Sequence, residues 1–280
     1  MLLPRVSPTQ YLDVSDGRLA YDDAGAGPLV ICVPGLGDVR TSYRFLTPKL
    51  VGAGYRVVTM DLRGHGESSV GWPDYASTSI ASDVLAVVHA LAAGPAILIG
   101  NSYGGAAVAY AAATDHAAVA SLVLLDAFVR DAPQNFFQRL SVWAVGRLGP
   151  SVCTSYYKSL YRSTPPADLA EYSKALTANL KQRGRFTATV AMMHSSHAAI
   201  TPRLSDIHAP TLVVVGTNDP DFPDPVAEAR FIEAQLTGTT QKQVALINGA
   251  GHYPHAEMPD TLVPVLLSFL QSVKVQQHDA

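Results

Sequence analysis

The chain has 280 residues, enough for one large domain or two ordinary ones. Hydrophobic residues make up 48% of it and charged residues only 15%, a composition that excludes an intrinsically disordered protein. The 20 Lys and Arg residues against 23 Asp and Glu give a net charge of −3, so no positive field attracts nucleic acid or anionic lipid. We therefore expect a globular protein that binds neither nucleic acid nor a membrane.

The cysteines and the apolar stretches indicate where such a protein works. Cys32 and Cys153 lie far apart without a C-x-x-C spacing, which fits neither a disulfide framework nor a zinc site. Pro4 interrupts the short apolar start, so the chain lacks the apolar core of a secretory signal. The longest apolar stretch, residues 84–100, is broken by a histidine, a glycine and a proline and is too short to span a bilayer. We expect a cytoplasmic protein without a membrane span.

A hairpin opens the pattern of predicted elements. Residues 10–14 and 18–21 flank the dipeptide Asp16-Gly17, which is typical of a tight turn between antiparallel strands. The sequence therefore predicts an antiparallel edge at the start of the sheet.

Five short runs rich in Val, Ile and Leu follow, each bounded by Gly, Pro or Asp. Continuous apolarity of this kind is typical of strands that helices cover on both faces. Between the runs, apolar residues at helical spacing predict helices over residues 79–93 and 103–114. The alternation predicts an α/β fold with a doubly wound, mostly parallel sheet. The predicted buried strands are residues 29–33, 55–61, 96–100, 122–126 and 211–216.

The stretch between the last two of these strands contains helical patterns only. It is too long for an ordinary loop, so we predict a helical cap over an active site. The predicted domains are a core of residues 1–127 and 206–280 and a cap of residues 128–205. Beyond residue 216 the core continues with a helix over 224–238, a strand over 243–247 and a helix over 260–273.

The sharpest motif is Gly100-Asn101-Ser102-Tyr103-Gly104, which directly follows a predicted strand and directly precedes a predicted helix. A serine on such a turn adopts strained backbone angles, and the two glycines remove the side chains that would collide there. The hydroxyl group is then forced outward. The start of the helix also directs free N–H groups and a partial positive charge toward an oxyanion beside Ser102. The motif predicts a nucleophilic serine.

A serine hydroxyl needs a base, and the base needs a carboxylate to hold it. His252 follows a predicted strand and a Gly249-Ala250-Gly251 turn, which makes it the predicted base. Asp219 follows the strand before that one, in a Gly-Asn-Pro loop that can bend toward the histidine. Asp126, at the end of the preceding strand, remains the alternative carboxylate.

The loop after the first buried strand, residues 33–37, can supply a second oxyanion donor. The N–H of Leu36 can face the N–H of Tyr103 across the site. This loop lacks the Lys-Ser/Thr pair of a phosphate-binding loop and the third glycine of a dinucleotide fingerprint, so we expect no cofactor. His194 and His197 lie three apart on a predicted cap helix but lack nearby cysteines or carboxylates, so no metal site is predicted.

These motifs together resemble those of the α/β-hydrolase superfamily, in the form that carries a helical cap. The resemblance covers nearly the whole chain. Besides the serine turn it includes residues 61–68, similar to the loop after the family's fourth strand, and the Asp219-Pro220 and Gly251-His252 loops. By this resemblance Ser102 is the nucleophile, His252 the general base and then acid, and Asp219 the orienting carboxylate.

The same resemblance implies that the N–H groups of Leu36 and Tyr103 form the oxyanion hole. Pro34 is a departure, since many members have histidine before the glycine of this loop. His65, His255 and Glu257 are predicted to support loops rather than to react.

The resemblance implies a cofactor-free serine hydrolase that cleaves an ester or related acyl bond of a small, mostly apolar substrate. A cap must present apolar groups to the cleft, so Phe128, Phe136 and Trp143 are predicted to contact substrate. Two alternatives remain: a hydrolase of carbon–carbon bonds in ring-cleavage products, which Gly100-Asn101-Ser102 also resembles, and a ligand sensor with slow turnover. The oligomeric state stays open, with a homodimer as one alternative.

Overall fold

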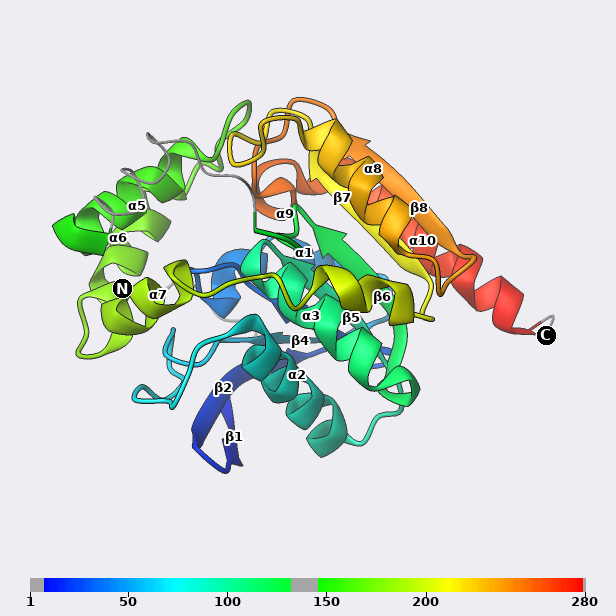
Figure 1. Ribbon diagram of the computed structural model, residues 1–280, viewed down its shortest axis with the longest axis horizontal. Coiled ribbons are helices and arrows are strands. Elements are labelled where there is room, and N and C mark those ends of the chain that lie inside the picture. The colour runs from blue at the N-terminus through cyan, green and yellow to red at the C-terminus, as the bar shows by residue number, and fades with distance from the viewer. Residues whose placement is uncertain (1–7, 132–145, 279–280) are drawn as a thin grey trace.

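One sheet forms the centre of the molecule. The computed structural model describes residues 8–131 and 146–278. Within these residues eight strands form a sheet in the order β1-β2-β4-β3-β5-β6-β7-β8 (Figure 1). The strands are β1 Gln10–Val14, β2 Gly17–Ala24, β3 Leu29–Val33, β4 Arg56–Met60, β5 Ala96–Asn101, β6 Val119–Leu125, β7 Thr211–Gly216 and β8 Lys242–Ile247.

The strand directions agree with the sequence pattern. β1 pairs antiparallel with β2, and β2 pairs antiparallel with β4, whereas all other neighbours are parallel. The predicted antiparallel edge and the doubly wound, mostly parallel sheet are thus confirmed. The strands over 10–14, 29–33 and 211–216 have the predicted bounds, and the others differ by a few residues.

β3 illustrates why the central strands are apolar throughout. All five of its residues are buried. Leu29, Ile31 and Val33 belong to the hydrophobic cluster on one face, and Val30 and Cys32 belong to the cluster on the other. Because helices cover both faces, neither set of alternating side chains can be polar.

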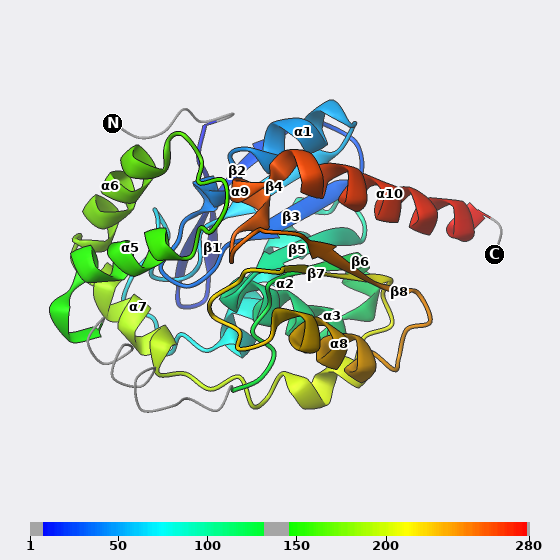
Figure 2. The same ribbon diagram turned by 90° about the horizontal axis from the view of Figure 1, so that it is seen from above.

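Helices cover the two faces of the sheet unequally. Side chains of α2, α3 and α8 join one cluster and those of α1 and α10 join the other, so the two groups lie on opposite faces (Figure 2). Their bounds are α1 Leu46–Gly52, α2 Ser77–Leu91, α3 Tyr103–Thr114, α8 Pro225–Gln235 and α10 Pro259–His278; α9, Pro254–Glu257, is a single turn. In the described residues no helix combines the length and the apolarity that crossing a bilayer requires.

Three described helices, here called the cap helices, lie between β6 and β7 in the chain: α5 Pro150–Ser159, α6 Leu169–Leu180 and α7 Arg185–Met193. They group together at one side of the sheet (Figure 1). Tyr157 and Tyr172 from these helices share a buried cluster with Tyr253, the residue after the predicted base. This cluster packs the cap helices against the histidine loop. His194 and His197 were expected on a helix, but α7 ends at Met193, and both residues lie beyond it.

Candidate active site

Ser102 lies at the turn between β5 and α3 with φ of +54° and ψ of −119°. L-residues rarely adopt a positive φ, so the position is strained. Surrounding hydrogen bonds hold it there: Ser102 N–H donates to the Leu125 carbonyl at 2.9 Å, and Phe128 N–H donates to the Ser102 carbonyl at 3.2 Å. The residue is only 6% exposed. The predicted tight turn is therefore present.

The glycines of the motif are required by close backbone contacts. A Cβ atom on Gly100 would lie 2.5 Å from the Gly104 carbonyl oxygen, and one on Gly104 would lie 2.4 Å from the Pro34 carbonyl oxygen. Both distances are far below van der Waals contact, so any side chain would displace the turn or the neighbouring loop. Glycine at these positions lets β5, α3 and the loop after β3 meet at Ser102.

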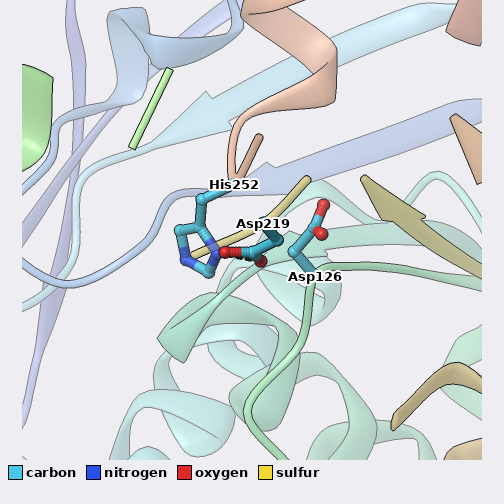
Figure 3. A group of neighbouring side chains, drawn as sticks. All are labelled: Asp126, Asp219 and His252. Carbon is cyan, nitrogen blue, oxygen red and sulfur yellow. Dashed lines mark hydrogen bonds and ion pairs between the residues drawn. The ribbon is translucent and has the colours of Figure 1, made fainter. Parts of the chain in front are cut away.

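His252 and Asp219 form a buried pair (Figure 3). The Nδ1–H of His252 donates to Oδ2 of Asp219 at 2.6 Å, and Oδ1 of Asp219 accepts the N–H of Asp221 at 2.9 Å. The side chain of Asn101, which precedes Ser102, donates to the His252 carbonyl at 3.0 Å. The serine turn and the histidine loop therefore border the same site.

A third carboxylate lies beside the histidine. Oδ2 of Asp221 is 3.8 Å from Nε2 of His252, and its Oδ1 accepts a hydrogen bond from the hydroxyl of Tyr156 on α5. Burial lowers the pKa of His252, but the charges of Asp219 and Asp221 outweigh it and leave the pKa raised. Asp221 was not singled out from the sequence. Its place two residues after Asp219, in the same loop, was the available signal.

Asp126, the alternative carboxylate, lies close to the pair without bonding to the histidine. Ligand-type atoms of Asp126, Asp219 and His252 all lie within 4.8 Å of one another (Figure 3). Of the described residues, only these three form a cluster with the composition of a metal site. The 2.6 Å between His252 Nδ1 and Asp219 Oδ2 is a hydrogen-bond distance, too short for two atoms that share a metal ion. The arrangement fits an acid–base pair with a second acid behind it.

The loop after β3 approaches Ser102 from the other side. A Cβ atom built on Gly35 would lie 3.5 Å from the Ser102 hydroxyl oxygen, which places the next residue, Leu36, beside it. Neither Leu36 N–H nor Tyr103 N–H takes part in the hydrogen bonds that join the described loops and turns. That these two N–H groups bind an oxyanion stays a prediction.

His65 supports that loop. Its Nε2 accepts the N–H of Gly37 at 3.2 Å and the hydroxyl of Thr189 at 3.0 Å, while its Nδ1–H donates to the Arg63 carbonyl at 3.1 Å. Burial lowers the pKa of His65 to about 4, so the ring is neutral and can accept at Nε2. The sequence-based expectation of a supporting role is confirmed. Its link to a cap helix through Thr189 was not foreseen.

Two further residues hold the histidine loop, as expected. Glu257 accepts the N–H of Gly251 at 2.7 Å and, through its other oxygen, the N–H of Ser163 at 2.5 Å. His255 bonds through Nε2 to the Ser42 hydroxyl at 2.9 Å. These contacts fix the segment that carries His252 against the chain that follows α5 and against Ser42.

Aromatic rings form a wall next to the histidine. The ring centroid of Phe128 lies 5.5 Å from that of His252 and 5.0 Å from that of Phe222. His197 adds to this wall, with its centroid 4.9 Å from that of Tyr103. Phe136 and Trp143, also predicted to contact substrate, lie outside the described residues. A cavity of about 530 Å³ adjoins the acid loop; its lining includes Tyr161, Arg162, Asp219 and Phe222.

Comparisons with known proteins identify the family of the chain. The profile of the alpha/beta hydrolase family matches residues 30–265. The proline iminopeptidase PfmaB of Pestalotiopsis fici is 27% identical over 287 residues, which cover 94% of this chain and 99% of the relative.

Solved structures show the same fold. A thermophilic esterase of Thermogutta terrifontis is 25% identical with a TM-score of 0.75, over 94% of this chain and 99% of the esterase. A hydrolase of Pseudomonas aeruginosa is 24% identical with a TM-score of 0.76, over 95% and 99% of the two chains. The chain therefore belongs to the alpha/beta hydrolase family and is a hydrolase.

Proposed function

We propose that the protein is a serine hydrolase that cleaves an ester or related acyl bond of a small, mostly apolar substrate. The observation that carries the proposal is the buried His252–Asp219 pair, 2.6 Å apart, beside a strained serine turn. A histidine oriented by a carboxylate is what a serine hydroxyl needs in order to attack at neutral pH.

In the first half of the reaction the Ser102 oxygen attacks the carbonyl carbon of the substrate, and Nε2 of His252 takes the hydroxyl proton. The carbonyl oxygen becomes an oxyanion, which the N–H groups of Leu36 and Tyr103 stabilise. His252 then gives its proton to the leaving alcohol as the bond to the acyl carbon breaks, which leaves an acyl group on Ser102.

In the second half water attacks the acyl carbon. His252 takes a proton from this water and returns it to the Ser102 oxygen as the acid product leaves. Throughout, Asp219 holds the Nδ1–H of His252 and stabilises the imidazolium that forms twice in each cycle. The histidine is neutral when it acts as a base, so the raised pKa of His252 sets a lower pH limit on activity.

Two observations support an apolar acyl substrate. The wall beside His252 consists of the rings of Phe128 and Phe222, which favour apolar groups. The relative from Thermogutta terrifontis is named an esterase.

We also propose that residues 128–205 act as a cap on a core of residues 1–127 and 206–280, because α5, α6 and α7 lie between β6 and β7.

A panel of p-nitrophenyl esters, lactones and vinylogous diketones tests the bond class. We expect turnover of esters with Ser102→Ala reduced by about 10³-fold or more. Ser121→Ala is the matched control, because Ser121 is also buried but lies within β6 rather than at the serine turn. This variant should keep the activity of the parent protein. Diketone turnover without ester turnover would replace the proposal by carbon–carbon hydrolysis, and slow turnover of every compound would favour a ligand sensor.

A further inference from the structure

The end of β6 carries a buried acid that the proposed mechanism does not use. Asp126 is fully buried and has φ of +44°, in the left-handed region that non-glycine residues rarely adopt. Its N–H donates to the Val214 carbonyl at 2.9 Å, and its Oδ1 accepts the N–H of Gly216 at 2.9 Å. Its Oδ2 is also buried and accepts no hydrogen bond from the described residues. An ionised carboxylate with one oxygen left without a donor is costly in such a place.

A second carboxyl group lies close to Asp126 (Figure 3). Asp219 and Asp126 are both buried, and one carboxylate oxygen of each lies within 4.8 Å of the other. Two carboxylates so close in a buried site cannot both ionise without a large penalty. Asp219 has a charged-group partner in His252 and a backbone donor in Asp221 N–H, whereas Asp126 has one backbone donor. The negative charge is therefore more stable on Asp219 and the proton on Asp126.

The other acidic groups near Asp126 favour the same state. They are Asp219 and Asp221, in the loop after β7. His252, in the loop after β8, also lies nearby, and its ring is neutral when it acts as a base. Burial is the largest cause that raises the pKa of Asp126, and the charge of Asp219 is the next. The N–H of Gly216 lowers this pKa, and the charge of Asp221 adds a smaller rise. The proton belongs on Oδ2, because Oδ1 is occupied by the N–H of Gly216.

We propose that Asp126 is a positioning residue that stays protonated at neutral pH and donates a hydrogen bond from Oδ2 to Asp219, fixing the carboxylate that orients His252. This inference rests on the proposed function for its kinetic consequences only. The protonation state of Asp126 is a property of the folded chain and can be measured without a substrate.

The kinetic test compares two variants. In Asp126→Asn the amide carbonyl accepts the Gly216 N–H and the amide N–H₂ donates to Asp219, as the protonated acid does. Asparagine also tolerates a positive φ. We expect kcat within a few-fold of the parent protein. Asp126→Leu removes both hydrogen bonds and should lower kcat by about tenfold or more. Asp219→Asn, which removes the charge itself, should lower kcat by about 10³-fold or more.

The substrate-free test follows stability with pH. If the folded protein retains a proton that the unfolded chain releases above about pH 4, rising pH favours unfolding of the parent protein. Relative to Asp126→Asn, its unfolding equilibrium constant should increase by up to about tenfold per pH unit between pH 5 and the pKa of folded Asp126. Urea midpoints from pH 5 to 8 measure this, with the exposed Asp13→Asn as control, which should parallel the parent.

The outcomes separate the inference from the proposed function. Parallel pH dependence of the parent protein and Asp126→Asn would show Asp126 ionised in the folded state and overturn the inference. An inactive Asp126→Asn together with an active Asp219→Asn would make Asp126 the orienting carboxylate and overturn it as well. Full activity of Ser102→Ala would instead refute the serine mechanism. The urea midpoints would then still decide whether Asp126 is protonated in the folded protein.

Discussion

The strained backbone of Ser102 allows a prediction that separates loss of function, caused by removing the hydroxyl group, from gain of stability, caused by removing the Cβ atom. Ser102→Ala and Ser102→Gly both delete the hydroxyl group, but only Ser102→Gly also removes the Cβ atom. At φ of +54° and ψ of −119° a residue with a Cβ atom costs about 1–3 kcal/mol, and this cost vanishes for glycine. Against this, glycine lowers the free energy of unfolding by about 0.5–1 kcal/mol, because the unfolded chain is freer at a glycine. We therefore expect Ser102→Gly to be more stable than Ser102→Ala by about 1 kcal/mol, and by no more than about 2.5 kcal/mol.

The comparison of the two variants isolates the backbone, because both lack the hydroxyl and neither should turn over ester. Urea denaturation of each at one pH gives the difference in free energy of unfolding from the two midpoints. At a position with ordinary backbone angles the order is reversed, and Ala is the more stable residue by about 0.5–1 kcal/mol. Gly105→Ala is unsuitable as a reference, since its Cβ would lie 2.4 Å from that of Ala127. An alanine variant equal to or more stable than the glycine variant would refute the strain argument.

The other predictions concern the residues around Ser102, His252 and Asp219. The pH at which kcat/KM falls on the acid side should lie above the ordinary imidazole pKa, because Asp219 and Asp221 raise the pKa of His252 despite burial. Asp221→Asn should move this fall to lower pH, and an unchanged profile would contradict the effect of Asp221 on His252. His65→Leu should lower kcat about tenfold, because the N–H of Gly37, in the loop of the proposed oxyanion donor Leu36, loses its acceptor. His65→Gln, which can still accept this hydrogen bond, should restore part of the activity. Phe128→Ala should raise KM for apolar esters about fivefold, and an equal rise for acetate esters would argue against apolar contact.

Much of the fold could be predicted because the signals are local. β3 and β7 are continuous apolar runs between turn residues, and α3 follows directly from the glycine-flanked serine. Helix α1, Leu46–Gly52, was not predicted. It has one proline inside and a glycine at its end, and its helical state depends on the packing of Leu46 and Leu50 under the sheet. Tertiary contacts, not local preference, stabilise this segment.

The candidate site, like the fold, could be predicted from the sequence only in part. Ser102, Asp219 and His252 all follow strand ends, and parallel strands bring their carboxyl ends to one edge of the sheet. Asp126 follows a strand end too, so the sequence could not rank the two acids by position alone. The bend of the β7 loop, which brings Asp219 to Nδ1 of His252, appears only in three dimensions. The same holds for Asp221, which lies near Nε2 of that ring and contacts Tyr156 of the cap.

Trapping the acyl-enzyme would show the covalent step of the proposed reaction itself. The protein is mixed with excess p-nitrophenyl butyrate, quenched in acid within the first turnover, digested, and analysed by mass spectrometry of its peptides. If Ser102 is the nucleophile and His252 the base, we expect one acyl group on the peptide that contains Ser102, none in Ser102→Ala, and much slower acylation in His252→Ala. Hydrolysis of the ester with an unmodified Ser102 peptide, or an acyl group on another residue that forms at the rate of turnover, would contradict this assignment.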